Sequence, residues 1–223
     1  NDAYEREAWI WRALLHQPRY SHVPLVLAHA SSEAVEKVSS AQRADFVFDY
    51  LKFSGEKINA VRPHPDGGHG LVLEWALPKA LRCSLIVPTR DRADLLDQCL
   101  HSVSDTTKDS RIELDWLVID NGSKELATLR CLAAWKQKLG KKLRVIKDDS
   151  PFNWSALNNR AVCASSADLL LFLNNDVEAI HAGWLETMAA QAVRPAVGSV
   201  GAVLLYPDGS LQHAGVVVGM NGG

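Results

Sequence analysis

The chain has 223 residues, of which 47% are hydrophobic and 22% charged, as in ordinary globular proteins with one large domain or one domain and an appendage. Its formal net charge of −2 argues against a nucleic-acid-binding protein, which normally carries a basic excess. The longest apolar run, residues 169–173, is far shorter than the roughly 20 residues that a helix needs to cross a bilayer.

Four cysteines lie within apolar patterns, and no two of them form a CxxC pair. Cys83 falls in an expected strand, whereas Cys99, Cys131 and Cys163 fall in expected helices. Buried free thiols are typical of proteins in a reducing compartment. We therefore expect four free, buried cysteines and a location in the cytoplasm.

The first 80 residues predict a small α+β appendage. Two histidines, His64 and His69, flank a Gly-rich turn that we expect to be an exposed hairpin tip rather than a metal site. Pro78 then opens the main domain. The elements expected before it are a helix at 3–15, a strand at 23–28, a helix at 32–53, a strand around Val61 and a strand at 71–75.

From Cys83 onward, short apolar runs alternate with helical patterns, which predicts a mostly parallel sheet covered by helices. The expected strands are 84–87, 114–119, 143–146, 169–173, 200–206 and 212–218, the last two flanking a hairpin turn. The expected helices are 92–103, a helix ending near 139, 155–165 and 184–193.

Several boundaries of these elements have specific signals. Pro88 is expected to stop the first strand, and Ser123 to cap the helix that ends at Gly140. Asn153 or Ser155 is expected to cap the helix at 155–165. Because the run 169–173 is apolar throughout, we expect a central strand buried on both faces.

Three polar clusters directly follow expected strands, at residues 88–92, 120–123 and 174–176. Ligands of open α/β sheets bind outside the carboxyl ends of the strands, so the clusters are expected to converge on one edge. Neither GxGxxG nor GxxxxGK[ST] occurs, which argues against a dinucleotide site or a P-loop. Asp176 is instead suited to hold Mg²⁺ or Mn²⁺ on a phosphate, with Asn174 and Asn175 bonding a ribose or water.

Six segments, taken in order, resemble family-2 glycosyltransferases of the GT-A fold, in the branch that builds bacterial surface polysaccharides. They are residues 83–92, 117–123, 152–159, 171–178, 184–186 and 204–215. The resemblance implies an α/β fold of GT-A type, a Rossmann-like sheet flanked by helices. It also implies a glycosyltransferase that uses a nucleotide-diphosphate sugar.

The resemblance also assigns roles to individual residues. Asp120 would accept a hydrogen bond from the base, uracil or thymine being the natural partners, and Asp176 would hold the metal on the diphosphate. Asn174 and Asn175 stand where many relatives have one or two acids, so one carboxylate remains at this motif. The nucleotide-binding residues it implies are Pro88, Thr89, Arg90, Asp91, Asp120, Asn121, Asn158 or Asn159, Asn174 and Asn175.

The reaction implied is an inverting, metal-dependent transfer of a hexosyl-type sugar from a UDP- or dTDP-linked donor to a glycan or lipid-linked acceptor. It would take place in the cytoplasm or at the inner face of the membrane. The catalytic base in relatives comes from a later acidic segment, which we expect beyond Gly223, so this chain is expected to bind the donor but to catalyse poorly. Glu178 is expected to be solvated or to lie at a helix entry.

The same resemblance suggests an organisation in three parts. Residues 1–30 would be the tail of a preceding domain, residues 31–78 a linker helix and hairpin, and residues 79–223 a nucleotide-sugar-binding domain that is incomplete at its C-terminus. Two alternatives remain open. One is a non-catalytic nucleotide-sugar-binding or scaffold module. The other is a sugar-phosphate nucleotidyltransferase, which would need a Gly-rich basic loop that residues 88–91 do not provide.

Overall fold

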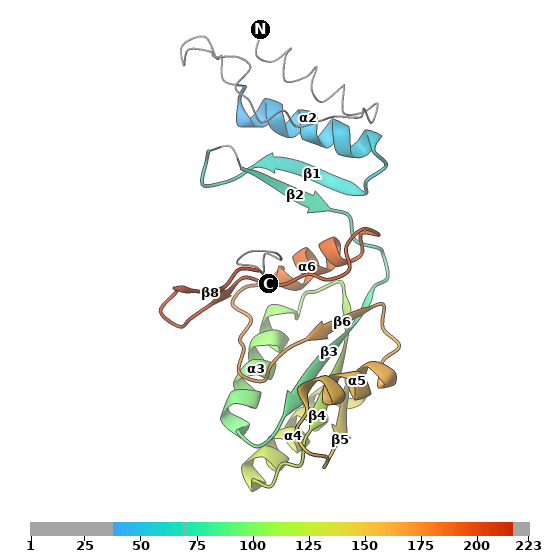
Figure 1. The fold of residues 1–223 in the computed structure, drawn as a ribbon, viewed down its shortest axis with the longest axis vertical. Coiled ribbons are helices and arrows are strands. Elements are labelled where there is room, and N and C mark those ends of the chain that lie inside the picture. Colours follow the sequence, from blue (N-terminus) through green and yellow to red (C-terminus); the bar gives the residue numbers. More distant parts are fainter. Residues whose placement is uncertain (1–37, 69, 216–223) are drawn as a thin grey trace, which may run out of the picture. The chain divides into compact units, whose positions relative to one another are not determined.

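A computed structural model describes residues 38–68 and 70–215 of the chain (Figure 1). The chain divides into two compact units, Asn1–Ala76 and Leu77–Gly223, and each is described by itself. Several expectations lie outside the described residues: the helix at 3–15, the strand at 23–28, the start of the helix at 32–53, His69 and the end of the last strand.

In the described part of the first unit, the helix α2 (Ser40–Phe53) is followed by an antiparallel pair of strands, β1 (Ile58–Pro63) and β2 (Leu71–Trp75). A capping box starts α2, because the Ser39 side chain accepts from the Gln42 N–H while the Gln42 side chain accepts from the Ser39 N–H. These elements confirm the expected α+β appendage in the part that the structure describes.

The second unit is built on a four-stranded parallel sheet with strand order β5-β4-β3-β6. Helices flank the sheet and a short antiparallel hairpin follows them (Figure 1). The strands are β3 (Arg82–Thr89), β4 (Glu113–Asp120), β5 (Leu143–Lys147), β6 (Leu169–Phe172), β7 (Leu204–Leu205) and β8 (Leu211–His213). The helices are α3 (Ala93–Thr106), α4 (Leu126–Leu139), the 3-10 turn η1 (Gly140–Lys142), α5 (Trp154–Ala164) and α6 (Trp184–Ala192).

The two central strands, β3 and β4, are covered on both faces. On one face, alternate residues such as Leu85 and Val118 pack in a cluster with the buried sides of α3 and α4. On the other face, Ile86 and Leu117 pack against Leu157 of α5. This two-sided burial explains why both strands read as nearly continuous apolar runs, and it confirms the predicted α/β class.

The expectation of a central strand at 169–173 is wrong. In the described residues β6 is an edge strand that pairs only with β3. The Leu170 and Phe172 side chains are 39% and 44% exposed, whereas Leu169 and Leu171 pack against the core. An apolar run indicates burial somewhere along a strand, but it does not distinguish a central strand from an edge strand.

The expectation that Pro88 stops the first strand is also wrong. Strand β3 continues through Pro88 to Thr89, and Pro88 stays in register with Ile119 of β4. The Ile86 carbonyl points toward β6, because it accepts a hydrogen bond from the Leu173 N–H. Backbone groups two residues apart in a strand point to the same side, so the nitrogen of Pro88 also faces β6. Because the β3–β6 ladder ends at Ile86, the missing N–H of Pro88 costs no strand hydrogen bond.

Of the expected helix caps, the structure confirms some and contradicts others. Ser123 does not cap α4, whose N-cap is Glu125, because the Ser123 hydroxyl accepts a hydrogen bond from the Asp91 N–H instead. Asn153, rather than Ser155, caps α5 by accepting from the Ala156 N–H. Gly140 ends α4 with a positive φ of 56°, as its position after the last apolar residue indicated.

All four cysteines are free, as expected, but they are not all buried. Cys83 and Cys99 are buried, and burial raises the pKa of each thiol to about 12. Cys131 is half-buried, and Cys163 is exposed on α5. The helical spacing therefore predicted the element that carries Cys163 but not the side of the helix that it occupies.

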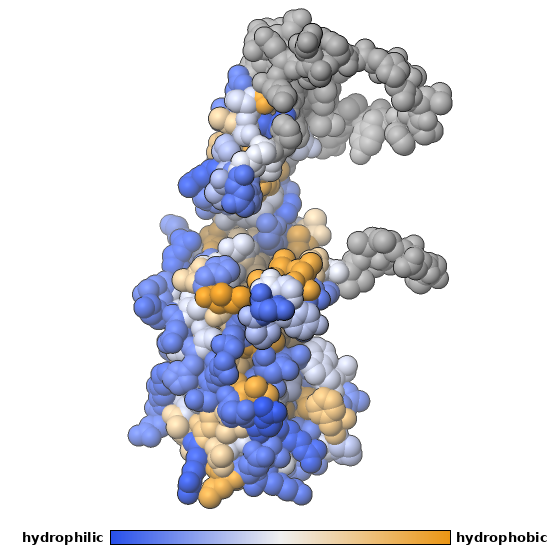
Figure 2. All heavy atoms as spheres, turned by 90° about the vertical axis from the view of Figure 1, so that its left-hand side faces the viewer, coloured by the Kyte–Doolittle hydropathy of each residue, from blue (hydrophilic) through white to orange (hydrophobic). Residues whose placement is uncertain are grey.

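Figure 2 shows hydrophobic residues in small separate groups among hydrophilic ones on the face of residues 77–215 that it displays. Within the described ranges, no helix is both long enough and apolar enough to span a bilayer.

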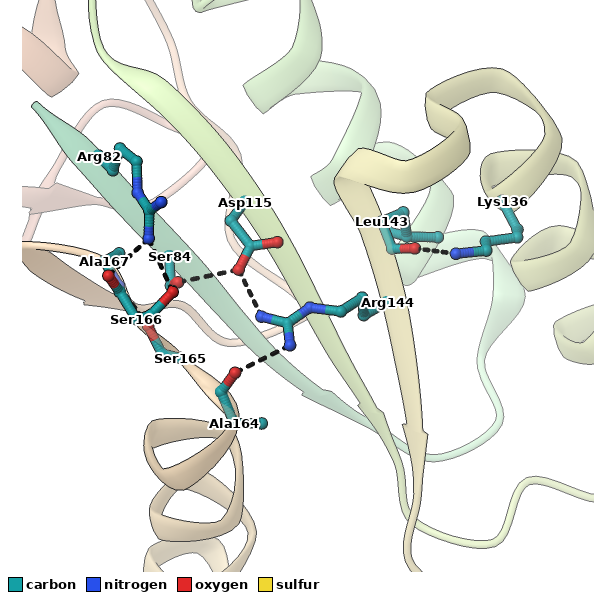
Figure 3. Close-up of polar contacts among 10 residues, drawn as sticks. All are labelled: Arg82, Ser84, Asp115, Lys136, Leu143, Arg144, Ala164, Ser165, Ser166 and Ala167. Atoms are coloured by element: carbon teal, nitrogen blue, oxygen red, sulfur yellow. Dashed lines mark hydrogen bonds and ion pairs between the residues drawn. The ribbon is translucent and has the colours of Figure 1, made fainter. Parts of the chain in front are cut away.

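A polar network fastens the end of α5 to the amino-terminal half of the sheet (Figure 3). The Asp115 carboxylate on β4 accepts from the buried Ser84 hydroxyl on β3 (3.2 Å) and pairs with the Arg144 guanidinium on β5 (2.6 Å). Arg144 also donates to the Ala164 carbonyl in the last turn of α5 (2.8 Å). A cation at a helix C-terminus satisfies an unpaired carbonyl, so this network fixes where α5 lies on the sheet.

We expect Asp115→Ala to lower the free energy of unfolding by about 1–2 kcal/mol, because it leaves the Arg144 guanidinium without its carboxylate. Urea denaturation measures the change. Glu113→Ala removes an exposed acid from the same strand and is the matched control, with an expected effect within about 0.5 kcal/mol. Equal effects of the two substitutions would show that the network does not stabilise the fold.

Candidate functional site

The carboxyl ends of β3, β4 and β6 meet at Thr89, a residue that is 4% exposed. Its carbonyl accepts from the Asn121 N–H at the end of β4 (2.8 Å). Its hydroxyl accepts from the Asn175 side-chain amide in the loop after β6 (3.1 Å). The structure thus brings the three polar clusters predicted from the sequence to one edge of the sheet.

The loop after β3 is strained and is held against the start of α4. Asp91 and Arg92 have φ of 53° and 54°, a left-handed conformation that costs roughly 1 kcal/mol or more for a residue with a side chain. The Asp91 Oδ1 atom accepts from the N–H groups of Lys124 (2.7 Å) and Glu125 (2.9 Å). These bonds satisfy unpaired donors at the helix start and offset the strain.

Electrostatics at this helix start favour the ionised form of Asp91. The Glu125 and Lys124 N–H groups lower the pKa of its carboxyl below the usual range, with a smaller contribution from the positive charge of Arg90. Arg90 itself is exposed, and Pro88 is half-buried. Asp91 is therefore an anion that orders the loop, and this loop carries the predicted nucleotide contacts.

At the end of β4, the buried Asp120 side chain holds the loop that follows this strand, and the buried Asn121 side chain holds the segment after β5. The Asp120 Oδ1 atom accepts from the Ser123 N–H (3.0 Å), and the Asn121 side-chain amide donates to the Asp148 and Ser150 carbonyls (2.8 and 2.9 Å). Asp120 and Asn121 are 4% and 3% exposed. Hydrogen bonds to the loop after β4 and to the segment after β5 therefore fix the positions of these two side chains.

Asp148 belongs to this region, although the sequence analysis did not single it out. Its side chain is buried, accepts from the Ser150 hydroxyl and backbone N–H, and pairs with Arg160 of α5 (3.1 Å). The two hydrogen bonds from Ser150, followed by the charge of Arg160, lower the pKa of the Asp148 carboxyl. The signal that could have found it is its position two residues after the strand expected at 143–146, close to a strand end like the other clusters.

Asn158 and Asn159, in the first two turns of α5, differ in their exposure to solvent. Asn158 is 3% exposed and donates to the Trp154 carbonyl (2.8 Å), whereas Asn159 is exposed. Trp154 donates from its indole N–H to the Asn174 side chain (3.3 Å). Helix α5 is thereby joined to the loop that follows β6.

Two buried acceptors in this region lack a hydrogen-bond partner among the described residues. They are Asn121 Oδ1 and Asn158 Oδ1, both in residues that the sequence assigned to the nucleotide site. A buried acceptor without a donor costs about 1–3 kcal/mol, so such atoms are expected to meet water or a ligand.

The loop after β6 is held by α3 and carries two exposed carboxylates, Asp176 and Glu178. The Cys99 thiol donates to the Asn174 carbonyl (3.6 Å), and the Ala179 N–H donates to the Ser102 hydroxyl (3.0 Å). Glu178 accepts from the Gln98 side-chain amide (2.6 Å) and does not lie at the entry of α6. Asp176 is exposed.

The oxygen donors around Asp176 suit a divalent cation that keeps part of its water shell. Residues 38–68 and 70–215 contain no group of three His, Cys, Asp or Glu side chains that could enclose an ion. Mg²⁺ typically binds through one or two carboxylates, several waters and the phosphates of a substrate, and does not require an all-protein cage. One exposed carboxylate beside two asparagine amides fits an ion of that kind.

The comparisons with known proteins identify the family. Glycosyl transferase family 2 matches residues 84–214, which is more than half of the chain, so the chain belongs to this family. The resemblance seen in the sequence is thereby confirmed.

Two curated relatives extend the comparison. The chain is 43% identical over 174 residues to the O-antigen biosynthesis protein RfbC of Myxococcus xanthus, covering 78% of this chain and 13% of that protein. It is 39% identical over 196 residues to the uncharacterized protein y4gI of Sinorhizobium fredii, covering 87% of this chain and 21% of that protein. The chain therefore spans about a fifth or less of the length of these relatives.

Among solved structures, the chain resembles the mannosyltransferase PcManGT from Pyrobaculum calidifontis in complex with GDP-Man and Mn²⁺. The TM-score is 0.50 at 19% sequence identity, and the match covers 58% of this chain and 37% of that one. At this identity the likeness concerns the fold, which is the GT-A type expected from the sequence.

We predict that Asp91→Asn removes a pH-dependent part of the stability. The folded-state pKa of Asp91 is lowered, so its stabilising contribution is present above the unfolded value of about 3.9 and is lost as pH falls through the lower folded value. The difference in urea midpoint between the native chain and Asp91→Asn should hence be largest near neutral pH and should shrink on acidification below about pH 4. A difference that does not change with pH would contradict this role of the ionised carboxylate.

Proposed function

We propose that this chain provides the donor-sugar site of a glycosyltransferase that acts in the synthesis of a bacterial surface polysaccharide. The observation that carries the proposal is the meeting of three strand ends at Thr89, within a segment that belongs to glycosyl transferase family 2. The sequence similarity to an O-antigen biosynthesis protein supports a polysaccharide as the product.

In this proposal the nucleoside lies over the ends of β3 and β4. Asp120 accepts a hydrogen bond from the base, and the unpaired Asn121 and Asn158 oxygens meet donors of the ligand or of waters around it. Thr89 and Asp91 line the pocket together with Pro88. Because these side chains are buried or held by backbone hydrogen bonds, the pocket would be largely formed before the ligand enters.

The diphosphate lies beside the loop after β6, where Asn175 faces the ribose or the sugar. Asp176 would hold Mg²⁺ or Mn²⁺, and a bound cation of this kind neutralises charge that develops on the departing diphosphate. Arg90, exposed on the neighbouring loop, adds a positive charge near the phosphates. We propose a UDP- or dTDP-linked donor.

The proposed reaction is an inverting displacement. A hydroxyl oxygen of the glycan or lipid-linked acceptor forms a bond to the anomeric carbon while the bond from that carbon to the diphosphate oxygen breaks. A general base takes the proton of the hydroxyl. Glu178 is not assigned this role, because its carboxylate is engaged by Gln98. We therefore propose that the base lies beyond Gly223 and that this chain alone transfers sugar poorly.

A second candidate is a non-catalytic module that binds nucleotide sugars. The observation that favours it is the pair of neutral side chains, Asn174 and Asn175, which leave Asp176 as the single carboxylate of the motif 174–176. A weakly held cation would permit binding of the nucleotide without efficient transfer.

We expect a nucleoside diphosphate to raise the midpoint temperature of thermal unfolding of this chain in the presence of Mn²⁺. A ligand at 100 times its dissociation constant stabilises by about 2.7 kcal/mol, which corresponds to roughly 5–10 °C for a protein of this size. UDP, dTDP and GDP are each measured with and without Mn²⁺. The expected result is a manganese-dependent rise with UDP or dTDP.

Asp176→Ala should abolish the manganese-dependent part of the rise. Glu178→Gln is the matched control, because it removes a neighbouring carboxylate that the proposal does not use, and its rise should equal that of the native chain. No rise with any nucleotide would contradict the donor site. A rise accompanied by normal transfer rates from this chain alone would contradict the assignment of the base to a later segment.

A further inference from the structure

The indole of Trp154 sets the orientation of the Asn174 side chain in the loop after β6. Trp154 is the first residue of α5, and its indole N–H donates to the Asn174 Oδ1 atom (3.3 Å). An indole nitrogen can only donate, so the atom of the Asn174 amide that faces it has to be the carbonyl oxygen. The NH₂ group of this exposed side chain is left as a donor, and within the described ranges no hydrogen bond occupies it.

The Trp154 side chain is itself held by α5 and β6. Asn153 caps α5, and the Trp154 carbonyl accepts from the Asn158 side chain (2.8 Å), so the first turn of the helix is fixed. The ring centroid of Trp154 lies 6.3 Å from that of Phe172 at the end of β6. Trp154 is nevertheless 46% exposed. Burial does not account for a tryptophan with this exposure, whereas the hydrogen bond to the neighbouring loop gives its N–H a defined partner.

The next residue in the loop, Asn175, presents the opposite chemical group. Its NH₂ group donates to the Thr89 hydroxyl (3.1 Å), which leaves its carbonyl oxygen as an acceptor in the part of the chain that the structure describes. Two adjacent amides therefore offer one donor and one acceptor, and neither carries a charge. Vicinal hydroxyls of a sugar suit such a pair, because each hydroxyl can both donate and accept.

The two amides lie between the groups assigned to the base and to the diphosphate. Thr89, the partner of Asn175, accepts with its carbonyl from the Asn121 N–H (2.8 Å), directly after Asp120 at the end of β4. On the other side, Asp176 directly follows Asn175. The ribose of a nucleoside diphosphate lies between its base and its phosphates. With the base at Asp120 and the cation of the diphosphate at Asp176, as in the proposed function, the amides face the ribose.

We propose that Trp154 is a positioning residue, which directs the Asn174 NH₂ group toward the ribose diol so that the site prefers a ribonucleotide to a 2′-deoxyribonucleotide. The inference rests on the proposed function and deepens it, because it selects a UDP-linked donor over a dTDP-linked one. A 2′-deoxyribose lacks one of the two hydroxyls and leaves one amide without its partner. One neutral hydrogen bond at a partly exposed site corresponds to about tenfold or less in affinity.

The test compares the dissociation constants of UDP and dUDP, which differ only in the 2′-hydroxyl, by titration calorimetry on the full chain with Mn²⁺. The native chain should bind UDP about tenfold more tightly than dUDP. Trp154→Phe keeps an aromatic ring but removes the N–H. It should reduce the preference for UDP to about threefold or less and leave the dUDP affinity within about twofold of the native value.

The matched control is Trp184→Phe. It also removes an indole N–H that has a hydrogen-bond partner, in this case the Thr106 hydroxyl at the end of α3 (3.0 Å). Because neither residue belongs to the proposed donor site, the control should keep the native preference for UDP. An equal loss of preference in the two tryptophan variants would overturn the proposal.

A double variant tests whether Trp154 acts through Asn174. Asn174→Ala alone should lower the preference for UDP at least as far as Trp154→Phe does, and adding Trp154→Phe should cause no further change. Additive losses would overturn the positioning role, because they would show that the two side chains act independently on the ligand.

The remaining outcomes separate this inference from the donor site itself. Failure of both UDP and dUDP to bind would contradict the proposed function and this inference with it. Equal binding of the two nucleotides to the native chain would overturn the inference and leave the donor site standing. Equal binding, together with a loss in Trp154→Phe of the extra affinity of UDP-glucose over UDP, would overturn it in favour of amides that face the transferred sugar.

Discussion

The two hydrogen bonds of Thr89 hold the candidate site together. One oxygen of this buried residue joins β3 to the end of β4, and the other joins it to the loop after β6. Parallel strands bring their carboxyl ends to the same edge, but they do not determine the distance between the loops that follow. That distance is set by a hydroxyl and a carbonyl on one residue, with Asp91 fixing the adjoining loop against α4.

The region around this residue combines rigidity with local strain. Two consecutive residues in the left-handed conformation keep the loop after β3 in a narrow turn, and the carboxylate of Asp91 accepts from two N–H groups at the start of α4, which has no side-chain cap of its own. The same carboxylate therefore stabilises a helix and orders a binding loop. A substitution there would alter stability and ligand affinity together, so the two effects have to be measured on the same variants.

Much of the second unit could be predicted from the sequence, because its strands are apolar and are followed directly by polar clusters. The positions of α3, α4 and α5 follow from helical spacing, and Gly140 and Asn153 mark the end of α4 and the start of α5, whereas α3 runs three residues past its expected end. Among the expectations that failed, two did so for reasons that a one-dimensional pattern does not contain. The edge position of β6 depends on which strands pair, and the role of Ser123 depends on Asp91, which is 32 residues away in the chain. The unpaired oxygens of Asn121 and Asn158 likewise emerge only from the packed structure.

The uneven burial of the four cysteines has a practical consequence. Three thiols are buried or half-buried, and burial raises the pKa of each to about 11 or 12, which keeps them in the unreactive thiol form near neutral pH. Cys163 is exposed on α5, the helix whose first turn reaches Asn174. A maleimide dye or spin label would therefore attach mainly to this position without any engineered cysteine, and its signal would report how α5 responds when the neighbouring pocket is filled.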